Sequence, residues 1–415
     1  MRHRPTLALL AGTALTLPGL TQTRTGDAAL LATACNTFAA DLHARLAGKG
    51  APDAGPGSIA LALLMLLPGT RGPTEQEIAT VLHLPADLRG ARLHAAAQRL
   101  IEDLDLGGKG RHDTDGPVLR IANDLWTQDG FPVVAEYRHL LTASYGAMHH
   151  ALDFVGDPAG ALRTINAHVA GLTNQRIPEL LTPDLITPQT CVVITNAMWL
   201  KAQWQHAFPA SSTSPAAFTL ADGTAADVPM MHTTESFDYA ETDAWQCLVL
   251  PFAHCQLVCE LVLPRPGHEL AAAERVLLTD GHAGALRREV VRVDLPRFRV
   301  AGSHRLAKVL AAMGMPSAFD PTRADFTGLT AQRKLVVDDV VHQVWVQVDE
   351  TGAEAAAATA IVMKRGSKPT AGKPKVFTAD RPFAFVLRDR TTGLVLFHGR
   401  VTDPRLAPAA ARPVR

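Results

Sequence analysis

The sequence predicts an α+β fold in which helices pack on antiparallel sheets. Apolar residues recur mostly at helical spacing through roughly the first 190 residues, and strand-like runs dominate after that. The 415 residues contain no internal repeat and no Pro- or Gly-rich linker long enough to divide the chain. A single large domain is therefore expected.

The composition excludes several classes of partner. The chain has 40 basic and 40 acidic residues and a formal net charge of zero, whereas nucleic-acid-binding and membrane-surface proteins normally carry a basic excess. We expect neither partner. A hydrophobic content of 47% with 19% charged residues excludes disorder as the main state. The nine lysines are unevenly spread, because four of them lie between Lys364 and Lys375.

The first half of the chain predicts five helices. Residues 36–46 have helical apolar spacing, with Asn36 as a plausible N-cap. The run SIALALLMLL is apolar on nearly all sides and indicates a helix buried in a large core. Thr74 with Glu77 three residues later has the pattern of a capping box. Two further helices are expected within 132–146 and 160–174.

The later part of the chain predicts mainly strands. VLRIANDLWTQ is an early strand, and the later ones are VVITNAMWLKAQW, WQCLVLPF, CQLVCELVLP, VVRVDLPRF and KLVVDDVVHQVWVQVDE. SHRLAKVLAAMG predicts one intervening helix. The segment PFAFVLRDRTTGLVLFHGRV reads as a hairpin that turns near Arg390–Gly393.

The N-terminus and the cysteines leave alternatives open. Residues 1–24 combine a basic start with an apolar stretch, so they are either a signal peptide for a secreted or periplasmic protein or a retained extension of a cytoplasmic one. Five cysteines without a framework argue against disulfide stapling. Cys255 and Cys259 are expected as core thiols rather than metal ligands.

The segment 350–376, ETGAEAAAATAIVMKRGSKPTAGKPKV, is long and lies between strong strands, which is typical of a functional or disordered loop. In its first half every second residue, from Ala353 to Met363, is uncharged, and charge occurs only in the alternate set. A strand with one buried face needs this period of two. An Ala-rich helix or linker is the alternative.

Several ordered motifs settle this choice, because together they resemble the serpin family, the loop-inserting protease inhibitors. GAEAAAAT resembles the family's hinge and NAMWLKAQW its signature strand. PGSIALALLMLLPG, VPMM, DLPRFRV, ADFTGL and FTADRPFAFVLRDRTTGLVLFHGRVTDP match further family segments in the same order. The resemblance covers residues 36–404 as one domain and leaves 405–415 as a flexible tail.

The resemblance implies a serpin fold with three β-sheets, about nine helices and an exposed reactive-centre loop. It also implies a suicide substrate rather than an enzyme. A target protease attacks the loop and forms an acyl-enzyme, and the cleaved loop then enters the main sheet as a new strand. About fourteen inserting residues at ~3.3 Å each would span roughly 45 Å. The implied partner is a serine protease held in a covalent complex by a monomeric inhibitor, with no cofactor and no metal.

The resemblance assigns two groups of residues. The hinge begins at Glu350, and Gly352 supplies the backbone freedom of a pivot. A small residue stands at Ala353, and the small-residue run of inhibitory members matches Ala355, Ala356, Ala357 and Ala358. A polar cluster that controls sheet opening matches Ser58, Asn196 and His342, with Gly55 where many relatives carry serine. Trp204 matches the aromatic residue where insertion begins.

The scissile bond is less closely fixed. Counting forward from Glu350 at the family spacing gives Gly366–Ser367, whereas counting back from the Phe377 motif gives a position near Ala371. A one-residue adjustment of the hinge count gives Arg365–Gly366, and Arg365 suits a trypsin-like pocket. Alternatively, the loop's basic residues only keep it soluble.

Other functions remain to be weighed. A serpin-fold binding or chaperone protein without inhibitory activity is one, although the alanine hinge argues against it. Inhibition of papain-like cysteine proteases is another. The chain has no H-E-x-x-H, G-x-S-x-G or P-loop pattern, which argues against an enzyme. His149, His150, Asp113 and Asp115 are interpreted as surface residues.

Overall fold

The computed structural model describes residues 26–48, 53–104, 117–331, 335–353 and 373–405. Within these ranges the chain forms eight α-helices and fourteen strands. The helices are α1 (Asp27–Ala47), α2 (Pro56–Leu66), α3 (Gly72–Val81), α4 (Gly90–Leu104), α5 (Ala135–Tyr145), α6 (Pro158–Leu172), α7 (Leu270–Leu278) and α8 (Ala307–Met313). In the part described, no helix combines the length and apolar character that crossing a bilayer requires.

The strands form two sheets. They are β1 (Val118–Gln128), β2 (Met148–Leu152), β3 (Val192–Gln203), β4 (Ser214–Thr219), β5 (Ala225–Glu241), β6 (Trp245–Pro251), β7 (Leu257–Pro264), β8 (Arg287–Pro296), β9 (Phe298–Arg305), β10 (Val341–Val348), β11 (Gly352–Ala353), β12 (Lys375–Thr378), β13 (Phe383–Asp389) and β14 (Val395–Val401). The first sheet has the order β2-β1-β3-β11-β10-β9, and the second has the order β12-β8-β5-β6-β7-β13-β14 with β4 paired to β5.

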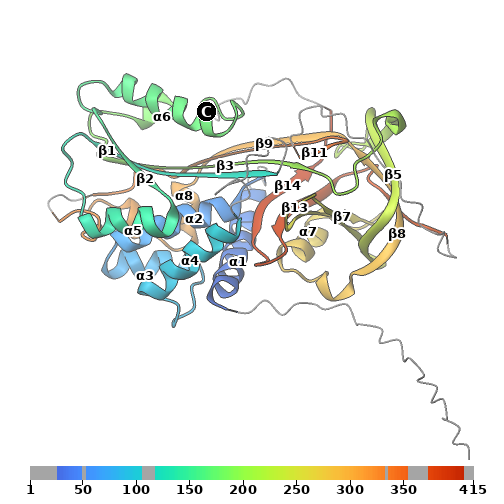
Figure 1. Ribbon diagram of the computed structural model, residues 1–415, viewed down its shortest axis with the longest axis horizontal. Helices are drawn as coiled ribbons and strands as arrows, with labels where there is room; N and C mark the ends of the chain where they lie inside the picture. The colour runs from blue at the N-terminus through green and yellow to red at the C-terminus, as the bar shows by residue number, and fades with distance from the viewer. Residues whose placement is uncertain (1–25, 49–52, 105–116, 332–334, 354–372, 406–415) are drawn as a thin grey trace, which may run out of the picture.

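The first sheet separates two layers of helices. Figure 1 shows α6 on one face of this sheet and α2, α3 and α4 on the other. All eleven residues of α2 are buried, as the apolar run predicted, and Pro56 starts the helix where its missing N–H costs nothing. A Cβ on Gly57 would lie only 2.7 Å from the carbonyl oxygen of Val395, so α2 packs almost backbone to backbone against β14.

Two sheets appear among the described residues where three were expected. The reason is β5, a continuous strand of 17 residues whose first half pairs with β4, whose end pairs with β6, and whose middle and end pair with β8. One long strand therefore joins two sets of strands through unbroken hydrogen bonding. The early strand β1 and the C-terminal hairpin of β13 and β14 are confirmed.

Two predicted helix starts are wrong. α1 begins at Asp27, nine positions before Asn36. The Asn36 side chain instead donates to the carbonyl oxygen of Gly393 (2.8 Å) and accepts from the N–H of Val395 (2.8 Å). Thr74 lies inside α3, where its hydroxyl accepts from the N–H of Asp325, and Glu77 binds Ser317 rather than the helix start. Both residues make tertiary contacts that a local pattern cannot specify.

The cysteines are all free in the structure. Cys259 is buried on β7 and Cys255 lies in the turn before that strand, so they do not share a strand face. Burial raises the pKa of the Cys255 thiol, which keeps it in the protonated form. This environment fits the expected core thiols.

Candidate functional site: the hinge and the opening of the main sheet

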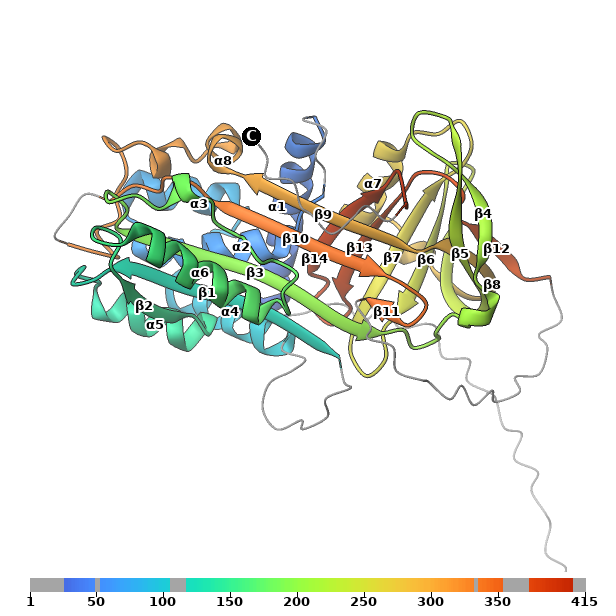
Figure 2. The same cartoon turned by 90° about the horizontal axis from the view of Figure 1, so that it is seen from above.

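The start of the predicted hinge is already a strand. β11 lies between β3 and β10, with Gly352 opposite Gln203 and Ala353 opposite both Ala202 and Val348. Ala353 is 2% exposed and belongs to the main hydrophobic core. An exposed loop was expected from Glu350 onward, and the structure differs at these first positions because small residues fit between two strands. Figure 2 shows β11 at one end of the channel between β3 and β10.

A turn at Asp349 reverses the chain from β10 into β11. The Asp349 carboxylate accepts from the N–H of Thr351 (2.9 Å) and from its hydroxyl (2.6 Å), and the backbone N–H of Asp349 donates to the carbonyl oxygen of Gly352 (3.1 Å). Asp349 was not among the predicted site residues, although the D-x-T-G pattern of residues 349–352 is a signal for this turn.

Trp204 fastens this turn to the end of β3. Its indole N–H donates to the carbonyl oxygen of Asp349 (2.9 Å), and its backbone N–H donates to that of Thr351 (2.8 Å). The ring stacks on Phe252 with centroids 4.5 Å apart. Trp204 therefore lies next to the first paired residues of the predicted hinge.

The Glu350 side chain is buried. Its carboxylate accepts two hydrogen bonds from the Arg297 Nε (2.8 and 2.9 Å), one from the Arg297 Nη2 (2.5 Å) and one from the Thr213 hydroxyl (2.5 Å). Burial on its own would raise the pKa of Glu350, but these hydrogen bonds outweigh it, so the pKa lies below its ordinary value. The first residue of the hinge is therefore held as an ionised group.

Gly352 is required by the close approach of two backbones. A Cβ at this position would lie 1.9 Å from the carbonyl oxygen of Ala202 and 2.8 Å from the Cα of Gln203. Its φ of 156° is also one that other residues rarely adopt. The expected role of Gly352 as a pivot thus has a second, steric basis in β11.

The predicted sheet-opening residues Ser58, Asn196 and His342 are buried, but in the described structure they do not form one hydrogen-bonded cluster. The imidazole Nε2 of His342 accepts from the backbone N–H of Gly55 (2.8 Å), so the position that lacks a serine still contacts the histidine through its backbone. Asn196 donates to the side chain of Asn123 across β1 and β3 (2.6 Å). The Ser58 hydroxyl is buried without a hydrogen-bond partner among the described residues. Burial, assisted by the charge of His304, lowers the pKa of His342 to about 3, so its imidazole is neutral.

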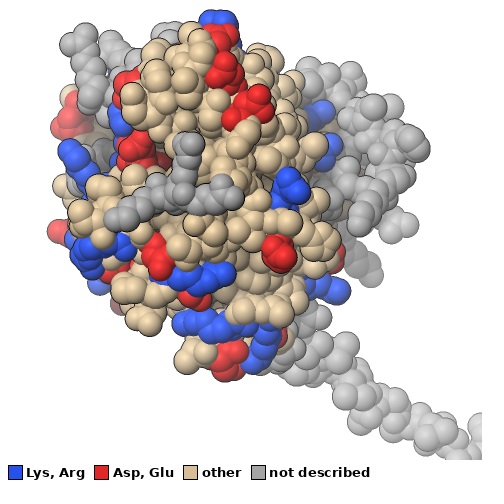
Figure 3. Space-filling model, turned by 90° about the vertical axis from the view of Figure 1, so that its left-hand side faces the viewer, with Lys and Arg blue, Asp and Glu red and all other residues tan. Residues whose placement is uncertain are grey.

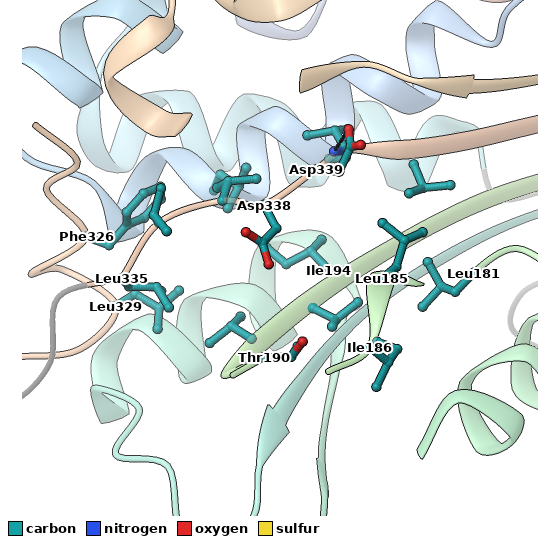
Figure 4. A pocket seen from close by; sticks show the side chains of 18 of the residues that line it. Leu181, Leu185, Ile186, Thr190, Ile194, Phe326, Leu329, Leu335, Asp338 and Asp339 are labelled. Atoms are coloured by element: carbon teal, nitrogen blue, oxygen red, sulfur yellow. Dashed lines mark hydrogen bonds between the residues drawn. The ribbon is translucent and has the colours of Figure 1, made fainter. Parts of the chain in front are cut away.

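Below β11 the main sheet contains an apolar cavity (Figure 4). It holds about 90 Å³ and is lined by the start of β3, the segment before β10, the end of α2 and the connection after α6. Thr190 and Ile194 approach it from one side and Leu335 and Asp338 from the other. Within the described residues, β3 and β10 are linked in the sheet only through β11. An apolar cavity therefore lies between the start of β3 and the segment before β10, at the end of these strands opposite to β11.

Several predicted site residues cannot be placed. Ala355, Ala356, Ala357, Ala358, Arg365, Gly366 and Ser367 lie outside the described residues, as do Asp113 and Asp115. Lys375, counted among the basic residues of the loop, opens β12 and pairs with Glu241 (2.7 Å). His149 and His150 were interpreted as surface residues, but both are half-buried, because His149 bonds to Thr127 (2.9 Å) and His150 to Asp124 (3.2 Å).

The comparisons with known proteins agree with this geometry. The family profile described as "Serpin (serine protease inhibitor)" matches residues 33–404. An uncharacterized serpin-like protein of Thermococcus kodakarensis is 37% identical over 381 residues, which cover 90% of this chain and 85% of the relative. The chain belongs to the serpin family.

Solved structures share the fold. Cleaved Serpin 42Da superposes with a TM-score of 0.79 at 25% identity and covers 91% of this chain and 99% of its own. Human thyroxine-binding globulin, in complex with its ligand, superposes with a TM-score of 0.80 at 24% identity, covering 91% of this chain and 100% of its own. The second likeness concerns the fold alone.

Proposed function

We propose that this serpin inhibits serine proteases of trypsin-like specificity by inserting its cleaved loop into the first sheet. The observation that carries the proposal is the position of β11, which already occupies one end of the channel between β3 and β10 while the other end remains an apolar cavity. Members of this family are generally protease inhibitors rather than enzymes, and the proposed inhibitor has no catalytic role of its own.

The register of β11 supports the length of the inserting segment. Gly352 and Ala353 pair with Gln203 and Ala202, so each step along the loop moves one step back along β3. Continued in this way, the pairing brings Met363 opposite Val192, the first residue of β3. The segment from Gly352 to Met363 would then span about 40 Å as a strand.

The same register supports cleavage just beyond Met363. Residues up to Met363 are needed to fill the channel, and Arg365 follows two positions later. Arg365–Gly366 is therefore the proposed scissile bond, with Gly366–Ser367 as the alternative. The guanidinium of Arg365 would enter a protease pocket that carries a buried carboxylate.

The alternating pattern of the loop agrees with this insertion. Ala353 faces the core, so continued alternation turns the uncharged set of Ala355, Ala357, Thr359, Ile361 and Met363 to the same side. The other set, which includes Glu354 and Lys364, would face α6 and solvent. Insertion in this register buries no charge on the core side.

The charge distribution supports a protein partner that recognises one loop of this chain rather than an extended charged surface on it. On the end of the molecule that Figure 3 shows, basic and acidic side chains are interspersed. We also propose a secreted or periplasmic location, which the basic start and apolar stretch of residues 1–24 support.

The decisive experiment incubates the untagged chain with a molar series of trypsin. We expect a covalent complex that survives SDS, release of a C-terminal peptide that begins at Gly366, and a large rise in the melting temperature of the cleaved protein. Clean turnover without a complex would overturn the proposal. A cleaved protein that gains no thermal stability would identify a non-inhibitory binding protein, and complex formation only with papain would identify a cysteine-protease inhibitor.

A further inference from the structure

Three residues from different elements meet on the outer face of the first sheet. Asp124 is on β1, His150 is on β2 and His168 is on α6. The two carboxylate oxygens of Asp124 lie 3.2 Å from the Nε2 of His150 and 2.9 Å from the Nε2 of His168. One ligand atom from each residue lies within 4.8 Å of the other two.

The strand register and the helix face bring this cluster together. Asp124 and Trp126 are two positions apart on β1 and share its outer face, and the parallel pairing sets Trp126 opposite His150. α6 packs Ala161, Ile165 and Val169 on that face, so His168 lies on the buried stripe of the helix. The three side chains therefore converge because of backbone geometry.

Trp126 fixes the two imidazoles. Its ring stacks on His150 at 4.2 Å with an interplanar angle of 20° and meets His168 edge-on at 5.2 Å. The indole N–H donates to the Thr195 hydroxyl (2.9 Å), which holds the tryptophan itself in place. Such pre-positioning of ligands by their neighbours is what metal sites require.

The described residues contain two other clusters of histidine and acidic side chains, and in each of them an arginine already pairs with a carboxylate. In the group of His43, Glu274 and His398, the Arg400 guanidinium bonds to the Glu274 carboxylate. In the group of Glu260, Asp280 and His282, the Arg388 Nε bonds to Glu260 (2.9 Å). A bound arginine already neutralises each of these carboxylates, so a metal cation would have to displace it.

The Asp124 carboxylate has a different environment. Its hydrogen-bond partners in the part of the chain described are the two imidazoles, which are themselves metal ligands rather than fixed cations. The side chain of Asp124 is 5% exposed, whereas His150 and His168 are 25% and 29% exposed. The anion is thus buried while one side of the cluster stays open to solvent.

The ligand atoms select the class of ion. Two imidazole nitrogens and one carboxylate oxygen suit Zn²⁺ and its neighbours Co²⁺, Ni²⁺ and Cu²⁺, whereas Mg²⁺ and Ca²⁺ prefer oxygen ligands alone. Tetrahedral bonds of ~2.0–2.1 Å separate ligand atoms by roughly 3.3 Å. The two contacts of the Asp124 carboxylate, at 3.2 and 2.9 Å, are close to this separation, and the three ligand atoms lie within 4.8 Å of one another, so small side-chain movements would bring them around one ion. A water molecule would take the fourth position on the open side.

We propose that Asp124, His150 and His168 form a Zn²⁺-class metal site that fastens α6 to β1 and β2. The bound ion replaces two hydrogen bonds with three coordinate bonds across three elements. α6 and the two strands then separate only when a ligand bond breaks.

The position of the site implies that a bound ion affects loop insertion into the first sheet. This part of the inference rests on the proposed function. The connection after α6 crosses β10 and β9 on the outer face. There Gln343 donates to the carbonyl oxygen of Glu179 (2.7 Å), Arg305 pairs with Asp184 (2.6 Å), and Arg176 lies over Trp345 (4.6 Å). A strand entering between β3 and β10 passes beneath this connection, so an ion that anchors α6 slows insertion.

Metal binding is tested on the untagged full chain after chelator treatment. We expect calorimetry to give one Zn²⁺ per chain, and Zn²⁺ to raise the melting temperature. His168→Gln and His150→Gln should each weaken binding at least about tenfold. The matched control is His139→Gln, which changes an exposed histidine of α5. Absence of binding, or equal affinity in His168→Gln and His139→Gln, would overturn the site.

Trp126 supplies a second measurement that does not depend on stability. Cu²⁺ bound beside His150 should quench Trp126 fluorescence, and the Trp126→Phe variant should lose that part of the quenching. If His168→Gln fails to fold, His150→Gln, at the exposed edge of the sheet, carries the same comparison. Quenching that persists unchanged in both histidine variants would contradict the assignment.

Different measurements test the metal site and its effect on loop insertion. A chain that binds Zn²⁺ but forms the protease complex at an unchanged rate keeps the metal site and loses its effect on insertion. A chain that inhibits nothing still reports the site through calorimetry and fluorescence, so failure of the proposed function leaves this test intact.

Discussion

Glu350 is buried more deeply than the arginine that pairs with it. The Glu350 side chain is 8% exposed and that of Arg297 is 38% exposed, although the two share a bidentate contact at the entrance of the hinge. The anion therefore depends on the pair, whereas the cation could be solvated without it.

This asymmetry predicts unequal effects of truncation. Arg297→Ala leaves a buried carboxylate with Thr213 as its remaining side-chain donor and should cost roughly 2–3 kcal/mol, whereas Glu350→Ala should cost about 1 kcal/mol. Because irreversible unfolding makes a melting temperature depend on the scan rate, the variants should be compared at one scan rate. Equal losses in the two variants would contradict the asymmetry.

His342 predicts a pH dependence. Its folded pKa of about 3 lies below the ordinary value of ~6.5, so between these values the unfolded chain binds the extra proton. Stability conferred by the neutral imidazole is complete above pH ~6.5 and is lost as the pH falls toward 3, by up to about 1.4 kcal/mol per pH unit.

The test of this prediction compares melting temperatures from pH 7.5 to 4.5. His342→Gln should show a shallower decline than the wild type, and His139→Gln should follow the wild type. Burial also lowers the pKa of the neighbouring His304, so a residual slope is expected in His342→Gln. An unchanged slope in that variant would show that His342 does not contribute.

Gly352 predicts a steric effect on the hinge. Gly352→Ala sets a Cβ against the Ala202 carbonyl, so β11 must leave the sheet and free the Trp204 backbone N–H from Thr351. Hydrogen exchange at the Trp204 amide should accelerate at least about tenfold, the equivalent of losing one hydrogen bond of ~1.4 kcal/mol. Gly130→Ala is the control, because it has a positive φ but nothing within 4 Å. Exchange at Trp204 that is equally slow in both variants would show that the clash does not displace β11.

The inserted register predicts different outcomes at adjacent alanines. Ala357 would lie on the core side opposite Met198, so Ala357→Glu would bury an unpaired charge and turn the inhibitor into a substrate. Ala356→Glu would face outward and retain more of the covalent complex. Titration against trypsin measures the inhibitor consumed per protease trapped. A reversed order would shift the register by one residue.

Local patterns predicted much of the fold. The apolar run of α2 and the hairpin of β13 and β14 follow from the spacing of neighbouring residues. Asn36 and Thr74 were misassigned because their side chains bind residues hundreds of positions away. The continuous strand β5 and the burial of His150 also depend on long-range packing, which periodicity in one segment cannot report.

The contact between α1 and the start of β14 has a consequence for folding during synthesis. Asn36 finds both of its backbone partners more than 350 residues later, at Gly393 and Val395. During translation α1 is therefore synthesised long before the hairpin of β13 and β14 that completes the hydrogen bonds of Asn36. The core stays incomplete until the hairpin of β13 and β14 has been synthesised. Packing of this hairpin is therefore expected to be a late step in folding.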